Sequence, residues 1–451
     1  MKPNVLFITI DTLRADRVVG TKKNSITPNL DNLIKNGVYF TQAISSSDVT
    51  GPTLGSLFTS LFPFKTGITL FTDNQKVPTF FKIINDSGYN VYTLYPDTSF
   101  FLKITANLSE NDPYEYSKRE SWIPLFGGLG KRIEEKLDNK LSEPWLYYIH
   151  LMDLHAPFHI PPEFNSEKYG PTEHDRMISA IDFWLGKFLE KINLKNTLVV
   201  ISSDHADYIP LGDNWNKPIK SNPVLKKGKK LFPMFEPFFV KILFKIQQSK
   251  HEKKIKSMKM KLTERELIAL DGRAGKHLFD ETINIPLIFS GYGVSSPKKI
   301  TTMVRQVDIF PTIADILEIP FDKYEIDGKS LFPAFSNQKI DEIPAYIETG
   351  SRHIKNEENA SNIFGKVIGI RTSKYKYWRS RNDPSKDVTL YDLKNDPLEK
   401  INIASKNPSI VKDMEKILKE LKKNSFQIEE KKFSDKETKE IEEELKKLGY
   451  I

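Results

Sequence analysis

Residues 4–11 read NVLFITID, and residues 196–207 read NTLVVISSDHAD. In both stretches an apolar run rich in β-branched residues is followed at once by a carboxylate, which is typical of a buried strand that ends at a polar edge. Such strands, when helices separate them, favour a mostly parallel sheet sandwiched by helices. Because the carboxyl ends of parallel strands meet at one edge, we expect Asp11, Asp204 and His205 to lie close together there.

Further apolar runs predict strands over 87–95, 145–152 and 285–291, and TPNLDNLIKNG (27–37) predicts a capped helix that ends at Gly37. From about residue 342 the sequence becomes strand-rich, and from 409 onward it is charged and helical. We therefore predict a large α/β domain over 1–340 and a smaller C-terminal α+β subdomain over 341–451.

Composition limits the classes of protein that remain. The chain has 451 residues, of which 39% are hydrophobic, so it is long enough for a large core. No run approaches the roughly 18 apolar residues of a membrane span, and the N-terminus enters a strand without a cleavable signal pattern, so we expect a cytoplasmic protein. The sequence contains no cysteine, which excludes disulfides, thiolate metal ligands and a cysteine nucleophile.

The excess of positive over negative charge comes from one segment, residues 217–261, which holds fourteen lysines against two glutamates. Within it, PMFEPFFVKILFKIQQ (233–248) places aromatic and aliphatic residues on one helical face and Lys241 and Lys245 on another. This pattern suits a peripheral contact with an anionic membrane or an anionic substrate, although a helix packed on the domain with a solvated lysine face would look the same. No nucleic-acid module accompanies the charge, so we expect no nucleic-acid partner.

Several polar side chains stand where strands or helices begin and end. In SSSDVTGPTLGSLFTSLFP (45–63), Thr50 precedes a Gly-Pro break and a helix-like run. Alone, this segment indicates only a loop with a helix cap, and an aspartate after a strand is also often a cap. The strand over 145–152 continues into HLMDLH, and Gly275-Lys276-His277 precedes the strand over 285–291. Two strand-end aspartates with an adjacent histidine indicate a site for a hard cation.

The order of the motifs resembles that of the sulfatase family of the alkaline phosphatase superfamily, over nearly the whole chain. The matching segments are NVLFITIDTLRADR, TPNLDNLIKNGVYFTQA, TGPTLGSLFTSLFP, YIHLMDLHAPF, VVISSDHAD, GKHLFDETINIPLIFSG, VRQVDIFPTIADILEIP with IDGKSLFP, GIRTSKYKYW, LYDLKNDPLEKINIA and ELKKLGYI. The resemblance implies an alkaline-phosphatase-like α/β fold and a metal-dependent ester hydrolase.

The resemblance also implies roles for individual residues. Thr50 takes the place of the family's cysteine or serine nucleophile, and Gly51-Pro52 would present it at a helix N-terminus. Asp11, Asp204 and His205, with the Thr50 oxygen, would hold one divalent ion, which can be Ca, Mg, Mn or Zn. His155, His277 and Lys276 would act on substrate oxygens or the leaving group, and Arg14, Gly51 and Asp153 would help to bind the substrate. A second metal held by Asp153 and these histidines stays open.

Three departures from the family pattern bear on the reaction. Threonine cannot be oxidised to the formylglycine aldehyde of sulfatases, so we expect no formylglycine. Leu54 replaces the arginine that ends the nucleophile motif, Thr12 replaces the second aspartate of the first motif, and no GKWHLG pattern is present. Superfamily branches that use threonine form a phosphothreonine, which favours a phosphorus ester over a sulfate ester.

Other activities remain open at this point. The chain would act on an anionic ester of a sugar, lipid or polymer, and a phosphoethanolamine or phosphoglycerol transferase would use the same residues. A catalytically weak binder of anionic glycans or lipids is the alternative of another class. Retention of Thr50 together with the three metal-ligand candidates argues against a binder, which has no need of an activated hydroxyl.

Overall fold

The computed structural model describes residues 2–68, 78–98, 101, 110–115, 123–138, 140–156, 158–208, 277–322, 324–336, 338–350, 364–423, 439 and 443. Lys276 and the lysine-rich segment 217–261 lie outside these residues.

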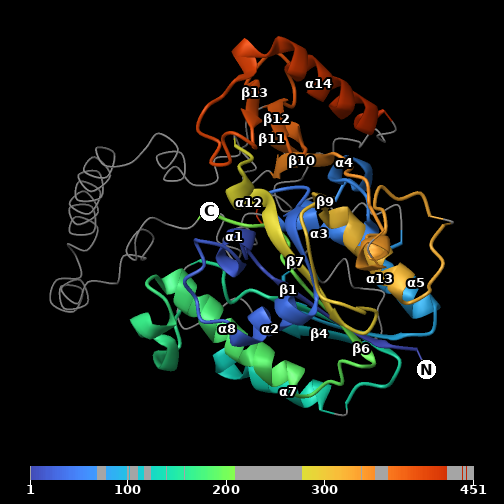
Figure 1. Cartoon of the computed structure of the whole chain (residues 1–451). Helices are drawn as coiled ribbons and strands as arrows, with labels where there is room; N and C mark the ends of the chain where they lie inside the picture. The colour runs from blue at the N-terminus through green and yellow to red at the C-terminus, as the bar shows by residue number, and fades with distance from the viewer. Residues whose placement is uncertain are drawn as a thin grey trace. The chain divides into compact units, whose positions relative to one another are not determined.

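The described residues form one large mixed sheet of nine strands, in the order β4-β3-β5-β1-β6-β7-β2-β8, with β9 also pairing with β2 (Figure 1). Neighbours from β4 to β6 are parallel, whereas β7 runs antiparallel to both β6 and β2. The strands are β1 (Asn4–Ile10), β2 (Val38–Ile44), β3 (Asn90–Pro96), β4 (Glu110–Tyr114), β5 (Trp145–Leu151), β6 (Thr197–Ser202), β7 (Asn284–Gly291), β8 (Lys298–Ile300) and β9 (Val304–Arg305).

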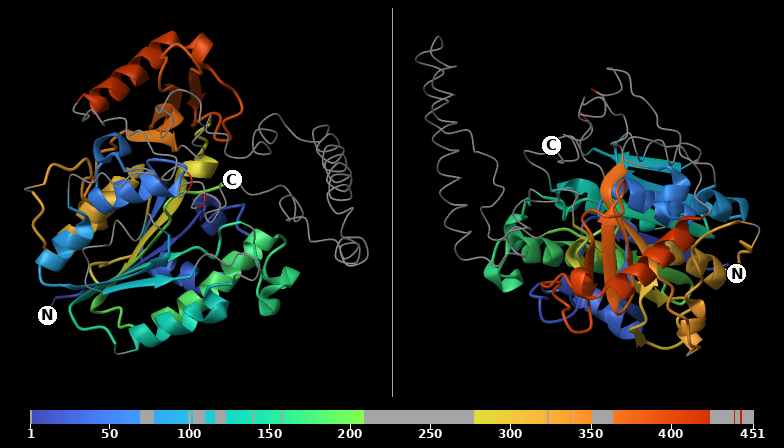
Figure 2. Two further views of the ribbon diagram at one scale, coloured as in Figure 1. Left: turned by 180° about the vertical axis from the view of Figure 1, so that it is seen from behind. Right: turned by 90° about the horizontal axis from the view of Figure 1, so that it is seen from above.

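Helices cover both faces of this sheet (Figures 1 and 2). On β1, Leu6 and Ile8 join one apolar cluster while Val5 and Phe7 join the other, because successive strand residues point to opposite faces. One face carries α2 (Pro28–Asn36), α7 (Gly130–Leu137) and α8 (Glu173–Leu189), and the other carries α3 (Thr50–Thr59), α5 (Phe80–Asp86) and α13 (Ile309–Ile316). The short helices are α1 (Ala15–Val18), α4 (Pro63–Thr66) and α12 (Asp280–Ile283).

A second, antiparallel sheet follows in the order β10-β11-β12-β13. Its strands are β10 (Ala345–Gly350), β11 (Phe364–Arg371), β12 (Tyr375–Ser380) and β13 (Thr389–Asp392), and α14 (Pro408–Lys422) packs on it. The same apolar cluster includes Phe62 and Phe64, which flank the start of α4. The C-terminal sheet therefore shares a core with the segment that follows α3.

The predicted fold class is confirmed: a mostly parallel mixed sheet between helices, with a smaller C-terminal subdomain built on an antiparallel sheet. The strand predicted over 87–95 begins only at Asn90, because α5 extends to Asp86 and a turn follows it. The antiparallel direction of β7 was not predicted, and the domain boundary at residue 340 stays a prediction. Among the described residues, no helix has the length and apolar character that a membrane crossing requires.

Candidate active site

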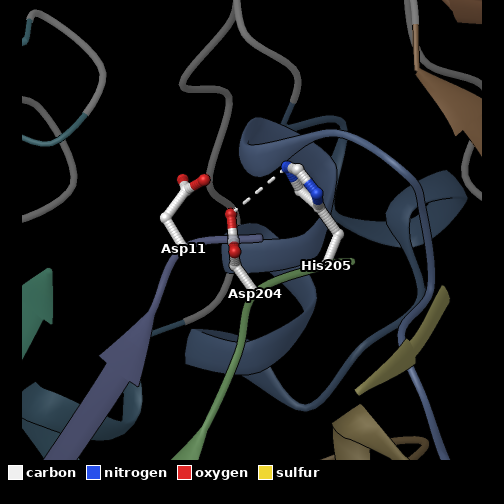
Figure 3. A group of neighbouring side chains, drawn as sticks. All are labelled: Asp11, Asp204 and His205. Atoms are coloured by element: carbon white, nitrogen blue, oxygen red, sulfur yellow. Dashed lines mark ion pairs between the residues drawn. The ribbon is translucent and has the colours of Figure 1, made fainter. Parts of the chain in front are cut away.

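Asp11 and the pair Asp204-His205 converge beyond the ends of two neighbouring parallel strands (Figure 3). Thr9 of β1 pairs with Ser202 of β6, so both strands end at the same level of the sheet. One ligand atom from each of Asp11, Asp204 and His205 lies within 4.8 Å of the others, and all three side chains are fully buried. The structure thus brings the three predicted metal ligands together.

Thr50 stands beside this cluster as the first residue of α3 and is buried. Its Oγ1 lies 3.2 Å from Nε2 of His205. Nδ1–H of His205 donates to the carbonyl oxygen of Ala206 at 2.9 Å, so Nε2 presents its lone pair to the Thr50 hydroxyl or to a metal. Gly51 N–H is one of the first-turn donors that have no acceptor within a helix, which suits an anionic group at this position.

The electrostatics of the cluster fit a divalent cation. Burial, and then the charge of Asp11, raise the pKa of Asp204 to about 7. Oδ2 of Asp204 lies 3.5 Å from Nε2 of His205. Two carboxylates and one imidazole nitrogen with an available lone pair are a normal ligand set for hard or borderline divalent ions. Such an ion would offset the repulsion between the two buried carboxylates.

Three further residues hold the two strand ends in place. Ser203 Oγ accepts from Leu13 N–H at 3.1 Å and lies 2.7 Å from the Ile10 carbonyl oxygen, which ties the end of β6 to that of β1. The buried Gln306 amide donates to the carbonyl oxygen of Asp204 at 2.6 Å. Thr12 has a φ of 61°, an uncommon value for a β-branched residue, and directs its N–H toward Asp204 Oδ1 at 3.4 Å.

The predicted histidines lie on segments that reach the same edge of the sheet. His155 follows β5 and is half-buried, and its Nδ1–H donates to the carbonyl oxygen of Ala156 at 2.9 Å. His277 precedes α12 and is half-buried, and its ring stacks on Phe279 with centroids 5.4 Å apart. Their roles toward a substrate stay predictions, as does that of Lys276, which lies outside the described residues.

Two predicted substrate-binding side chains are engaged within the fold. The buried Arg14 donates through Nε and Nη2 to Asp16 at 2.8 and 2.6 Å, and through Nη1 to the carbonyl oxygen of Asp207 at 3.3 Å. Asp153 Oδ1 accepts from Leu125 N–H at 3.0 Å, and burial raises the pKa of Asp153 to about 7. Their roles in substrate binding stay predictions.

A histidine for which no role was predicted lies directly against the cluster. His150, on β5, is fully buried, and its Nε2 is 3.5 Å from Oδ2 of Asp11. Burial lowers the pKa of His150 to about 4, so the imidazole is neutral near pH 7. The only indication in the sequence was its position on the third strand of the same edge.

Comparison with known proteins gives the class and then the family. The sheet order, with a buried polar cluster beyond its strand ends, is an alkaline-phosphatase-like fold. The model of the family described as Sulfatase matches residues 3–319, and a model described as N-sulphoglucosamine sulphohydrolase, C-terminal, matches residues 273–430. The chain belongs to the sulfatase family.

Individual relatives are more distant. Arylsulfatase K of Gallus gallus is 30% identical to this chain over 142 residues, which are 31% of this chain and 26% of that protein. Arylsulfatase K of Bos taurus is 28% identical over 139 residues, which are 31% of this chain and 25% of that protein. The matched part therefore spans about a quarter of these relatives.

Solved structures match over almost the whole chain. The phosphonate monoester hydrolase of Agrobacterium radiobacter has a TM-score of 0.68 at 17% identity, covering 94% of this chain and 96% of that one. A 2-O GAG sulfatase has a TM-score of 0.64 at 18% identity, covering 94% and 93%. At these identities the likeness concerns the fold alone.

Proposed function

We propose that the protein is a metal-dependent hydrolase of anionic esters that uses Thr50 as its nucleophile and prefers phosphorus esters to sulfate esters. The observation that supports this most directly is the position of Thr50 Oγ1, 3.2 Å from His205 Nε2 and at the N-terminus of α3. A hydroxyl at a helix start, beside two buried carboxylates and an imidazole lone pair, suits nucleophilic attack on an anionic ester.

The reaction can be assigned to the chain's own groups. The Thr50 hydroxyl gives its proton to solvent and its oxygen attacks phosphorus. The bond from phosphorus to the leaving alcohol breaks, and protonated His155 or His277 delivers a proton to the departing oxygen and takes one back from solvent. The N–H of Gly51 would bind a nonbridging oxygen. Water then attacks the phosphothreonine, releases phosphate and restores the hydroxyl. A divalent ion held by Asp11, Asp204 and His205 would favour loss of the Thr50 proton and offset charge on the nonbridging oxygens.

The preference for phosphorus follows from the nucleophile. The hydrate of formylglycine carries two oxygens on one carbon, so its sulfate ester can collapse with release of sulfate. Threonine carries a single oxygen on Cβ, so a sulfothreonine has no such exit, whereas water or an acceptor alcohol can displace a phosphoryl group from threonine. An acceptor alcohol in place of water would make the protein a phosphoethanolamine- or phosphoglycerol-type transferase.

Sulfate esters are the second candidate, because family membership favours them. The names of Arylsulfatase K and of the 2-O GAG sulfatase both refer to sulfate esters, and the second name refers to a glycosaminoglycan. For this chain the corresponding substrate is a sulfated sugar. The phosphonate monoester hydrolase, similar in fold, favours the first candidate.

A hydrolysis panel tests the proposal. Metal-reconstituted protein is assayed with an aryl sulfate, a phosphate monoester, a phosphodiester and a phosphonate monoester. We expect the highest kcat/KM with a phosphorus ester, a loss of several orders of magnitude in Thr50→Ala, and measurable activity in Thr50→Ser, which keeps the hydroxyl. Mass spectrometry of the peptide around residue 50 should show unmodified threonine. Near-normal turnover by Thr50→Ala would return Thr50 to a capping role, and a preference for the aryl sulfate would decide for the second candidate.

The lysine-rich segment 217–261 supports a separate proposal about location. It joins the rest of the chain between Asp207 and His277, and its lysines would bring a cytoplasmic protein to an anionic membrane at about 1 kcal/mol per charge. Co-sedimentation with anionic and neutral vesicles, at low and high salt, should show salt-sensitive binding that is lost when a short Gly/Ser linker replaces the segment. Equal, negligible binding by both proteins would remove the proposal.

A further inference from the structure

His150 is held in one orientation by its neighbours. Its Nδ1 lies 3.2 Å from the hydroxyl of Tyr148, two residues earlier on β5 and therefore on the same face of the sheet. Its ring also packs on Phe101, with centroids 4.8 Å apart. The Tyr148 ring packs edge-on against the rings of Phe7 and Phe58, with centroids 5.4 and 5.3 Å apart.

This arrangement decides which nitrogen of His150 carries the hydrogen. Burial raises the pKa of Tyr148 well above its ordinary value, so the phenol keeps its proton and can donate it to Nδ1. Nε2 then carries the hydrogen and lies 3.5 Å from Oδ2 of Asp11, a polar contact that is longer than a hydrogen bond of normal geometry. In the other tautomer a lone pair on Nε2 would face a carboxylate oxygen in a buried site, which is unfavourable.

We propose that Tyr148 and His150 are positioning residues that orient the carboxylate of Asp11 toward the divalent metal, with no direct contact between His150 and the ion. A donor fixed against one carboxylate oxygen restricts rotation of the carboxyl group, and residues that orient ligands in this way affect metal affinity. The proposal rests on the metal role of Asp11 in the proposed function.

The experiment measures metal binding rather than turnover. Dissociation constants for Mn²⁺ and Ca²⁺ are determined by equilibrium dialysis on wild type, His150→Leu, His150→Gln and Tyr148→Phe. We expect His150→Leu to bind about 10–100-fold more weakly, as is usual when a residue behind a metal ligand is lost. His150→Gln keeps an N–H near the position of Nε2 and should regain much of that affinity. Tyr148→Phe should weaken binding less than His150→Leu, because it removes only the preference for one tautomer.

His174→Leu is the matched control. His174, on α8, is another buried histidine, and its ring packs on Phe158, so its loss should lower the midpoint of thermal unfolding in EDTA without a change in metal affinity. Equal weakening of metal binding by His174→Leu and His150→Leu would overturn the proposal, as would wild-type affinity in His150→Leu. Complete loss of binding in His150→Leu, matching that in Asp11→Asn, would make His150 a ligand and also overturn it.

The outcomes separate this proposal from the proposed function. If wild type binds the metal but cleaves no ester, the proposed function fails while the positioning role is still measured by affinity. If activity and metal binding are normal and His150→Leu shows no change, only the positioning role fails.

Discussion

The charge of the metal-ligand cluster near neutral pH depends on whether Asp204 is ionised. The carboxyl group of Asp204 is fully buried, and burial together with the charge of Asp11 raises its pKa to about 7 from the ordinary 3.8. Because the folded state raises this pKa, the folded protein binds the proton more tightly than the unfolded chain does. The contribution of the protonated Asp204 to the free energy of unfolding is therefore fully present below about pH 4 and is lost as the pH rises through 7.

Asp204→Asn removes that ionisation, and we expect the metal-free variant to be more stable than wild type at pH 8 by about 1–4 kcal/mol, with no such gain at pH 4. A divalent ion should raise the unfolding midpoint of wild type but not that of the variant. Urea unfolding in EDTA from pH 4 to 8, repeated with saturating Mn²⁺, measures both effects. A constant difference between the two proteins across this range would show that Asp204 does not titrate there.

The sequence predicted the residues that follow a strand or align with a motif. It did not predict the residues that hold those side chains in place. Asp11, Thr50, Asp204 and His205 were predicted as one group, and the structure places them together. Ser203, Gln306 and His150 were given no role, because their importance lies in hydrogen bonds or contacts across strands, which no local pattern encodes.

At the scale of elements, the strand β10 supports the start of α3. Glu348 N–H donates to the carbonyl oxygen of Ser46 at 3.0 Å, and Gly350 N–H donates to Asp48 Oδ1 at 2.8 Å. A methyl group at Gly350 would lie 2.5 Å from Cβ of the buried Val49, the residue directly before Thr50. Thr50 is therefore positioned by both sheets together.

Gly350→Ala should displace Val49 and cost about 1–3 kcal/mol of stability, as overpacking of a filled core does. Because the displacement is next to Thr50, kcat should fall more than KM rises. Gly127→Ala is the control, since a methyl group there meets no atom within 4 Å. Urea unfolding and steady-state kinetics on both variants test this prediction. An unchanged kcat in a destabilised Gly350→Ala would show that the packing of β10 against Val49 does not affect turnover.

The order and direction of elements were only partly predictable. Apolar runs identified β1, β3, β5, β6 and β7, but such a run reads the same in both directions, so the antiparallel β7 could not be distinguished from a parallel strand. Its direction matters, because it brings the residues that precede the strand to the edge where β6 ends: Leu287 of β7 pairs with Ser202 of β6.

At the scale of the whole molecule, a buried ion-pair network joins the C-terminal sheet to α12. Lys376, on β12, has no exposed surface and pairs with Asp280 and with Glu399 Oε1, the latter at 2.7 Å. Arg371 Nη2 also pairs with Asp280, at 3.0 Å. Asp280 begins α12 only three residues after His277, so this network fixes the segment on which the predicted acid lies.

Lys376→Met should destabilise the protein by about 3–5 kcal/mol, because it leaves the buried Glu399 without its cation. Lys374→Met, which removes an exposed lysine two residues away, should change stability by less than about 0.5 kcal/mol. Adding Glu399→Gln to Lys376→Met should recover part of the lost stability, because it removes the buried charge that has no cation. The free energies of unfolding of the four proteins measure this, and equal effects of the two single lysine substitutions would refute a structural role for the network.

The contact between Asp48 and Gly350 also has a consequence in time. The two residues are 302 positions apart in the chain. A ribosome adding about 5–20 residues per second needs roughly 15–60 s to proceed from one to the other. During that interval the nascent polypeptide already contains Thr50 but lacks the strand against which its loop is held. The loop before Thr50 therefore gains its full support only late in synthesis, and a message truncated before codon 350 would yield a chain in which that support never forms.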